Sequence, residues 1–496
     1  MVAAAATIAV VYPHMNSLGG DGFWLIAAPG AAPLGIDACG AAARLASADI
    51  YRAAGFDAIP HRGGWAANTV AGTVSGWQAA LEQAGHLVGN RLPMSRLLAD
   101  AIDLAEQGVT VTASQHRATT SRQAELAGQP GFAGVFLPGG LTPATGDRLV
   151  QPALGATLRR LAEAGLDDFY RGDIARSMAT DLQRAVSPLT LADLASHRAA
   201  VVNPLSIKHS AGTLTNLPPP TQGLVTLLVI GILDRVLGTE IDPLGAPFVH
   251  ASVEATKLAF DIRDRVITDP AFSPIDCEEL LSSPALDTLA TRLDPHRAAP
   301  WAAGREPSDT VWLGVIDGSG MAVSFIQSTY HEFGSGLVLP ESGVTWQNRG
   351  CSFSLDPRAL NPLMPGRKPF HTLNPAMAEL DGRMLVLGSM GGDGQPQSIS
   401  AVFNRIDRGR MSPEEAVAAP RWLLGRTWGS AVTNLRMEAR FDGHVVDRLL
   451  SAGHDVDVID ARYSDTMGHA GAVILHPDWT MEGAHDPRAD GGAAGV

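Results

Sequence analysis

A threonine follows an acidic residue at Asp309-Thr310 and opens an apolar run in the second half of the chain. The run Val311–Ile316 leads into the turn Asp317-Gly318-Ser319-Gly320, and a second apolar run, Met321–Ile326, follows. Two such runs around a glycine-rich turn predict a β-hairpin. If the peptide bond before Thr310 is cut, this residue gains a free α-amino group that can act as the base for its own hydroxyl. The alternative is that Thr310 is an ordinary β-branched strand residue.

A second glycine-rich turn could complete such a reaction. The predicted strand Leu385–Gly388 leads into Gly391-Gly392-Asp393-Gly394, and a helix is predicted after Pro396. Backbone N–H groups in a turn of this kind can point at an anion. Three interpretations compete: a phosphate-binding loop, a structural turn and an oxyanion hole. The glycine spacing matches neither the Walker nor the dinucleotide motif. An oxyanion hole, which stabilises a tetrahedral intermediate, suits an acyl-transfer nucleophile such as Thr310.

Cationic and hydrogen-bonding residues gather in two further segments, 346–350 and 365–372. Long charged side chains are mostly exposed, so surface charge is the interpretation that composition favours. The functional alternative is recognition of a substrate carboxylate, because the guanidinium group of Arg presents a fork of donors to two oxygens.

The segments that must position these residues differ before and after Thr310. Before it, apolar residues recur three and four positions apart, which predicts helices. Thr190 is the predicted cap of a helix beginning near Leu191, and a Pro-rich loop, Pro218–Pro220, precedes the apolar helix Leu224–Leu237. The other predicted helices are Met1–Val11, Val74–Ala84, Leu97–Gln107, Leu154–Ala164, Ile174–Ala185 and Val249–Asp264.

After Thr310 the pattern favours strands alternating with helices. The hairpin runs are almost continuously apolar, as expected of strands covered on both faces, so two stacked sheets with helices outside are predicted. Residues 283–309 form a predicted exposed connector, since Pro295, Pro300 and Pro307 interrupt any long helix. The further predicted strands are Gly343–Gln347, Met384–Gly388, Leu435–Glu438 and Ala470–Leu475, and the helices are Ser398–Arg408, Pro413–Ala419 and Gly443–Ala452.

Composition excludes several classes of function. The 496 residues carry a net charge of −14, which opposes binding to nucleic acid or to an anionic membrane. The three cysteines, Cys39, Cys277 and Cys351, are scattered and form no CxxC pair, so neither a disulfide framework nor a zinc site is expected. No metal or other cofactor is therefore predicted. The apolar start has no basic n-region and is too short to span a membrane, so the cytoplasm is the expected compartment.

Several independent segments, in the same order along nearly the whole chain, resemble the γ-glutamyltransferase family. This resemblance implies an N-terminal-nucleophile hydrolase fold, a four-layer αββα sandwich, made as a precursor that cleaves itself before a Thr. The segments are Tyr12–Phe23, Pro218–Pro220, Asp309-Thr310 with its hairpin, Phe333–Gly336, Pro340–Gly343, Gly391-Gly392 and Asp486–Gly491.

By this resemblance Thr310 is the nucleophile and Asp309–Thr310 the cleavage site. Cleavage would give a large subunit, 1–309, and a small subunit, 310–496, of 496 − 309 = 187 residues. The two would form one structural unit as a heterodimer, or pair further as a dimer of heterodimers. Gly391 and Gly392 match the oxyanion-hole pair of the family, and Ser328 matches a Thr that hydrogen-bonds the nucleophile. The family usually has more chain before the helix that starts here at Met1, so a missing strand or a start assigned at an internal Met is expected.

The residues that would hold a γ-glutamyl group depart from the family pattern. The family's carboxylate-binding Arg is absent from Asp37–Gly40, and the Asp that pairs with the glutamyl amine falls at Ser352. The family's Ser-Ser pair falls at His371-Thr372 and its substrate Asn at Tyr330. Each lost charge-assisted contact costs about 1.5–3 kcal/mol, so a γ-glutamyl substrate is disfavoured.

The replacements resemble a divergent branch that includes enzymes hydrolysing oxamate in purine-ring degradation and cephalosporin or glutaryl acylases. They imply a self-processing amidohydrolase that acts on a small amide bearing one carboxylate, with oxamate as the favoured substrate. Its expected substrate-binding residues are Tyr330, Arg349, His371 and Thr372. The alternatives are a glutaryl or cephalosporin acylase, a γ-glutamyl hydrolase or transferase, and a non-catalytic binding protein on the same scaffold.

Overall fold

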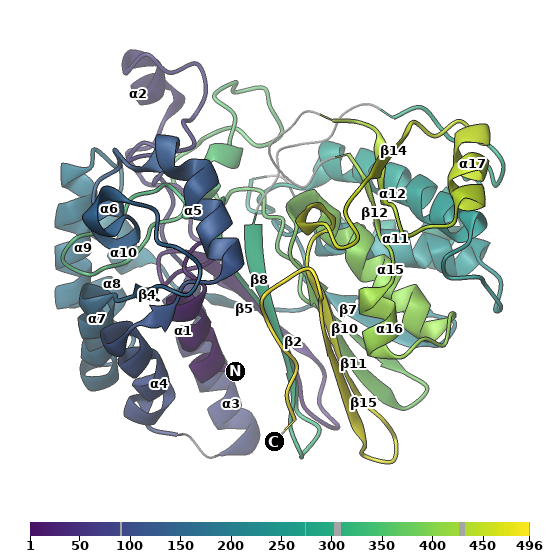
Figure 1. Cartoon of the computed structure of the whole chain (residues 1–496), viewed down its shortest axis with the longest axis horizontal. Helices are drawn as coiled ribbons and strands as arrows, with labels where there is room; N and C mark the ends of the chain where they lie inside the picture. The colour runs from purple at the N-terminus through teal and green to yellow at the C-terminus, as the bar shows by residue number, and fades with distance from the viewer. Residues whose placement is uncertain (90–91, 273, 302–308, 426–431, 496) are drawn as a thin grey trace.

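Two β-sheets lie face to face at the centre of the molecule, with helices on both outer sides (Figure 1). The computed structural model describes the whole chain except residues 90–91, 273, 302–308, 426–431 and 496. The first sheet has the strand order β5-β2-β1-β9-β8 and the second β16-β15-β11-β10-β7-β6. The strands of the first sheet are β1 (Asp21–Ala27), β2 (Leu34–Asp37), β5 (Ala200–Val202), β8 (Asp309–Ile316) and β9 (Ala322–Tyr330). Those of the second are β6 (Leu205–His209), β7 (Gly212–Asn216), β10 (Ala376–Leu380), β11 (Arg383–Ser389), β15 (Ala470–Leu475) and β16 (Met481–His485).

Three apolar cores separate the layers and establish the predicted αββα sandwich. One core packs helices against the outer face of the first sheet, and another does the same for the second sheet. The third lies between the sheets, where Phe23 and Ile326 meet Met377 and Val386. The strands of the hairpin β8–β9 therefore contact apolar side chains on both faces, as their continuous apolar pattern predicts.

The predicted helices are confirmed, most of them within a few residues at each end. Thr190 caps its helix together with Asp193 in a capping box. The long helices of the first outer layer are α1 (Val2–Val11), α3 (Thr73–Val88), α4 (Met94–Gln107), α5 (Ala113–Leu126), α7 (Pro152–Ala164) and α9 (Asp173–Arg184). On the second sheet lie α11 (Gly223–Val236), α12 (Ala246–Val266), α15 (Gln395–Asp407) and α16 (Pro413–Ala418), with α17 (Gly443–Ser451) beyond them.

Shorter elements complete the described chain. Its helices and 3₁₀ turns are α2 (Ala48–Ala53), α6 (Phe132–Phe136), η1 (Pro138–Gly140), α8 (Asp168–Arg171), α10 (Leu191–Ser196), α13 (Cys277–Leu280), α14 (Ser283–Ala290), η2 (Arg349–Ser352), η3 (Gly392–Gly394) and η4 (Asp465–Met467). Its short strands are β3 (Val109–Thr110) and β4 (Arg148–Leu149), which pair together, and β12 (Trp422–Leu424), β13 (Leu435–Glu438) and β14 (Val456–Ile459), which form a three-stranded sheet. No helix among the described residues is long and apolar enough to cross a membrane.

Three sequence-based predictions are wrong or incomplete. Gly343–Gln347 is not a strand: it makes only isolated bridges, because it crosses the loop end of the first sheet. Helix α14 begins inside the predicted connector, capped by Ser282, and the part of the connector at 302–308 lies outside the described residues. The strands before Thr310, from β1 to β7, were not predicted. β1 and β7 pair with β9 and β10, far away in the chain, whereas β1–β2 and β6–β7 also pair as neighbours along it.

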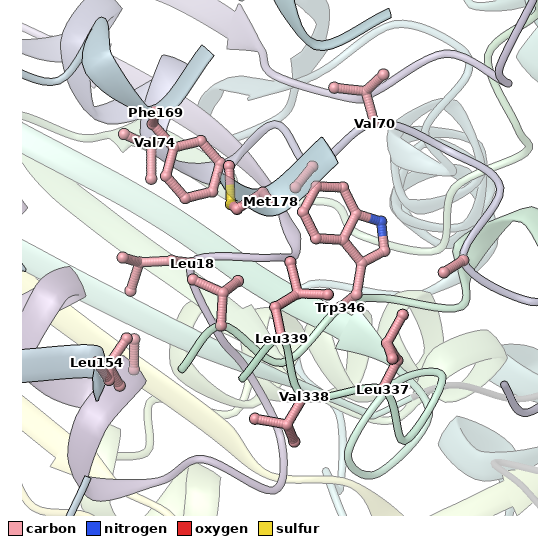
Figure 2. Close-up of a cluster of buried hydrophobic side chains, with 14 of the residues drawn as sticks. Leu18, Val70, Val74, Leu154, Phe169, Met178, Leu337, Val338, Leu339 and Trp346 are labelled. Carbon is pink, nitrogen blue, oxygen red and sulfur yellow. The ribbon is translucent and has the colours of Figure 1, made fainter. Parts of the chain in front are cut away.

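The first core joins the two halves of the chain around Trp346. In Figure 2 its indole lies near Leu337 and Leu339 from the second half and Val70 from the first half. The ring nitrogen of Trp346 donates to the backbone oxygen of Thr69 at 3.0 Å. The segment just before Arg349 is thus anchored deep in the protein.

Candidate active site

Thr310 lies near the start of β8, where the ladder to β9 is irregular. Asp309 pairs with Tyr330 and Val311 with Gln327, so two residues of β9, Ser328 and Thr329, face Thr310 alone. Such a bulge redirects side chains and is frequent next to active sites. Thr310 is 2% exposed, and its hydroxyl oxygen has no hydrogen-bond partner among the described residues. The nucleophile expected from the sequence is therefore a buried hydroxyl in an unbroken strand.

Tyr330 and Arg349 meet at the end of β9. Tyr330 has a φ of 84°, a left-handed conformation that costs a residue with a side chain about 1–3 kcal/mol. Its backbone N–H donates to the Ser328 hydroxyl at 2.8 Å. The guanidinium carbon of Arg349 lies 3.7 Å from the centre of the Tyr330 ring, a cation–π contact. The bulged hairpin thus places the ring under the guanidinium.

Arg349 is a buried cation that has no carboxylate partner in the described part of the chain. It is 1% exposed, its two terminal nitrogens donate to the Thr372 hydroxyl at 3.3 and 3.4 Å, and its Nε has no partner among the described residues. No described carboxylate lies within 4.0 Å of it. Burial lowers the pKa of Arg349, although the neighbouring Tyr330 and Asp21 oppose this shift. The surface-charge interpretation of this segment is therefore wrong, because the loops that carry it fold into the interior.

His371 is held by an aspartate that the sequence did not single out. Its Nε2 lies 3.1 Å from Oδ2 of Asp21, and its Nδ1 is buried with no partner among the described residues. Asp21 begins β1 and stands opposite Ser328 across the β1–β9 ladder. Thr310, Ser328 and Asp21 therefore occupy three adjacent strands. Asp21 belongs to Tyr12–Phe23, one of the segments that resemble the family, but no pattern in the sequence gave Asp21 a role of its own.

The glycine turn lies at the end of β11, and the side chain of Gln222 holds its backbone. Gly391 and Gly392 have φ angles of 121° and 53°, which glycine adopts without strain. Gln222 donates from one side-chain nitrogen to the backbone oxygens of Thr372 and Gly392, at 2.8 and 2.7 Å. This contact joins the glycine turn to the loop of His371 and Thr372. Sequence reasoning missed Gln222, because no local pattern marks it.

A buried ion pair supports the same turn. Arg263 on α12 lies 3.1 Å from Oδ2 of Asp393, and both side chains are almost fully buried. Arg263 also stacks over the Phe260 ring at 4.0 Å. A buried pair of this kind is costly to break from one side, so it restrains the turn.

A cavity of about 1100 Å³ has Thr310 among its lining residues. It runs along β8 toward β15 and the C-terminal segment, and Met390, His469 and Asp490 are among its lining residues. Arg349, Tyr330, His371, Gly391 and Gly392 are not among the described residues that line it. We place the candidate site at the cluster of polar groups rather than in this cavity, because the cluster holds the groups that can bind an anion.

Two buried groups of side chains have potential metal-ligand atoms close together, and protein partners already engage both. In the first, Nδ1 of His250 is 2.8 Å from Nε2 of His454, and Glu254 pairs with Lys257 at 2.7 Å. In the second, formed by Asp21, Cys39 and His371, both Asp21 oxygens accept hydrogen bonds. We assign neither as a metal centre.

The chain matches the family model described as gamma-glutamyltranspeptidase over residues 1–496. It is 55% identical over 496 residues to the oxamate amidohydrolase proenzyme of Klebsiella pneumoniae, covering 100% of this chain and 93% of that protein. It is 39% identical over 497 residues to the glutathione hydrolase-like YwrD proenzyme of Bacillus subtilis, with the same two coverages of 100% and 93%. Among solved structures it resembles a cephalosporin acylase from Bacillus halodurans, with a TM-score of 0.89, 30% identity and coverage of 99% of this chain and 90% of that one. The chain is therefore an amide hydrolase of the γ-glutamyltranspeptidase family, with the N-terminal-nucleophile hydrolase fold.

Proposed function

We propose that this protein is a self-processing amidohydrolase that converts a small amide bearing one carboxylate, most simply oxamate, into its acid and ammonia. The observation that carries the proposal is Arg349, a fully buried guanidinium with no described acidic partner. A buried cation of this kind is costly unless an anion joins it, and Arg is suited to holding a carboxylate with two donors. Relatives named as an oxamate amidohydrolase and as acylases agree with this reaction class.

Processing starts in the uncut chain. The Thr310 hydroxyl adds to the Asp309 carbonyl carbon, and the C–N bond between the two residues breaks as an ester to the Thr310 oxygen forms. The released nitrogen, which becomes the α-amino group of Thr310, takes up the hydroxyl proton. Water then hydrolyses the ester, leaving a carboxylic acid on Asp309 and a free hydroxyl and amine on Thr310.

The same hydroxyl then acts on the substrate. The α-amino group accepts the Thr310 hydroxyl proton as the oxygen attacks the amide carbon, and N–H groups at Gly391 and Gly392 stabilise the oxyanion. Collapse of the intermediate expels ammonia, which takes a proton from the α-ammonium group. Water, deprotonated by the same amine, releases the acid from the ester. Arg349 and Thr372 hold the substrate carboxylate, and the Tyr330 ring supports the guanidinium.

A γ-glutamyl substrate fits these residues less well. A γ-glutamyl group carries an α-amino group and an α-carboxylate, and each needs a charged partner. At the amine position stands Ser352, a neutral side chain that donates to the backbone oxygen of Phe370 at 3.4 Å. At the former Arg position stands Cys39, whose thiol has its pKa raised well above the usual value by burial and is therefore neutral. A substrate with one carboxylate and no amine therefore fits the single guanidinium of Arg349 better.

The test has two stages. Intact mass and N-terminal sequencing of the purified protein should give two fragments, the smaller beginning at Thr310. The cut protein should release ammonia from oxamate faster than it releases acid from a glutaryl amide. Thr310→Ala should stay uncut and inactive, whereas Thr310→Ser should retain both reactions at a lower rate, because it keeps a hydroxyl. An uncut chain that hydrolyses oxamate would disprove the mechanism, and faster glutaryl release would favour an acylase.

A further inference from the structure

The carboxylate of Asp21 has two differently occupied oxygens. Its Oδ1 accepts hydrogen bonds from the backbone N–H groups of Gly40 and Gly72 and from the side chain of Gln347, each at 3.1 Å. Its Oδ2 faces only one described partner, Nε2 of His371. Both side chains are fully buried. The orientation of the carboxylate is thus fixed by three donors, and its second oxygen is committed to His371.

Because of this geometry, the state of Nδ1 of His371 depends on how many protons Asp21 and His371 hold between them. With one shared proton, Nε2–H donates to the Asp21 carboxylate, and Nδ1 presents a lone pair. With a second proton, Oδ2 and Nε2 share one hydrogen and Nδ1 carries the other. Nδ1 is the buried atom without a described partner, and the neighbouring residue, Thr372, contacts Arg349. Whether Nδ1 of His371 carries a proton therefore decides whether it attracts or repels a carboxylate beside Arg349.

We propose that Asp21 is a positioning residue that lets His371 donate from Nδ1 to the substrate carboxylate, so that each carboxylate binds together with one proton. The inference rests on the proposed function, since it concerns the same carboxylate that Arg349 would hold. Asp21 itself touches no substrate atom. It acts by storing the proton that turns His371 from an acceptor into a donor.

The surroundings of the pair allow this uptake near neutral pH. Burial raises the pKa of Asp21 to about 7, although Arg349 and the three donors on Oδ1 oppose the shift. Burial lowers the pKa of His371 well below its usual value, and Arg349 and Lys368 lower it further. The other groups facing the pair are neutral or already paired: the Cys39 thiol, the Tyr170 hydroxyl, the Phe23 ring edge, and Lys368, which bonds Asp37 at 2.6 Å. An entering carboxylate therefore favours protonation of the Asp21–His371 pair. Asp21 takes up the proton, because burial has raised its pKa.

The test measures proton uptake on binding, with Asp21→Asn as the matched variant. Asn has the same shape, so its oxygen can accept from Gly40, Gly72 and Gln347 while its amide donates to Nε2 of His371. This holds Nδ1 permanently protonated and removes the titration. Calorimetry of oxalate binding to cut protein, in two buffers of different ionisation enthalpy at about pH 8, should show about one more proton taken up by wild type than by Asp21→Asn. The α-amino group of Thr310 is common to both proteins, so the difference isolates the pair.

The pH dependence of turnover gives the second readout. Above about pH 7, KM for oxamate should rise by about tenfold per pH unit in wild type, and in Asp21→Asn this slope should be lost. A purely structural role for Asp21 would change stability but not this slope. Should Asp21→Asn fail to fold or to cut, His371→Asn supplies the same comparison, since its amide can donate from near the Nδ1 position without titrating.

Equal proton uptake by wild type and both variants, or none by wild type, would overturn the inference. Proton-linked oxalate binding without oxamate turnover would support it and overturn only the proposed substrate. Turnover of oxamate without proton-linked binding would overturn the inference and leave the proposed function standing.

Discussion

At the scale of single residues, the site depends on one buried cation. Arg349 is buried, stacks on the Tyr330 ring and donates to the Thr372 hydroxyl, and its Nε has no hydrogen-bond partner among the residues that the structure describes. Such a group is stable only if the fold imposes it, and it then offers a strong site for a carboxylate. The same burial raises the pKa of Asp21 and lowers that of His371, which supports our proposal that the three side chains act on one ligand group.

Replacing Arg349 by Lys should weaken substrate binding more than it slows chemistry. Lys keeps the charge but loses the two-donor fork and the stacking on Tyr330. A loss of about 1.5–3 kcal/mol corresponds to a rise in KM for oxamate of roughly 10- to 150-fold, with a smaller change in kcat. Steady-state kinetics on cut protein measures this. Arg358→Lys is the matched control, because Arg358 lies on the surface and Asp356 is the one side chain it bonds in the described part of the chain. An unchanged KM in Arg349→Lys would contradict the assigned role.

At the scale of elements, the two sheets approach closely where Trp312 crosses β11. Trp312 stands two residues after the nucleophile, and its ring lies over Gly388, three residues before Gly391. The ring nitrogen donates to the Ser324 hydroxyl at 2.9 Å, which in turn donates to the backbone oxygen of Leu387 at 3.3 Å. This contact sets the spacing between β8 and the strand that leads into the glycine turn.

Gly388→Ala should therefore destabilise the fold and disturb the site. A Cβ at this position would lie 2.1 Å from Cδ1 of Trp312, so the sheets must shift apart. Overpacking of this kind costs about 1–3 kcal/mol, which should lower the thermal midpoint and slow self-cleavage. Gly318→Ala in the β8–β9 turn is the control, since nothing lies within 4 Å of its Cβ. Equal unfolding midpoints for the two variants would show that the sheets tolerate the extra methyl group.

At the scale of the whole molecule, each sheet combines strands from both sides of the proposed cut. β1 pairs with β9 over seven residue pairs in the first sheet, and β7 pairs with β10 in the second. The core around Trp346 also mixes the two halves. The large and small subunits that we propose, 1–309 and 310–496, would therefore form one folding unit rather than two domains.

The two fragments should remain together after cleavage without any covalent link. In native size-exclusion chromatography they should elute as one species containing both chains, because separation would expose both sheet edges and the shared cores. In denaturant they should separate into chains of 309 and 496 − 309 = 187 residues. The three cysteines are free and buried, so reducing agent should not change either result. Separation of the fragments in native buffer would contradict the single-unit proposal.

The sequence by itself determined the local features of this protein. Periodicity located the helices, and the two apolar runs around Gly318 and Gly320 predicted β8 and β9. Asp309-Thr310 drew attention as an acidic residue before a Thr, and the family resemblance made it the predicted cleavage site. These signals are local, because helix periodicity and turn chemistry act over a few residues. The order of motifs also predicted the fold, because it resembles that of a known family.

Only the tertiary structure decided which polar residues are brought together. Asp21 stands 349 − 21 = 328 residues before Arg349 and still further before His371. Composition, moreover, placed the two charged segments on the surface. Long-range pairing of β1 with β9 and the bulge opposite Thr310 fold them inward, and neither event leaves a local signal in the sequence. Burial, which no local sequence pattern shows, removes water from the aspartate–histidine pair and from a cation that has no carboxylate partner among the described residues. This is the physical reason for the anion site that we propose.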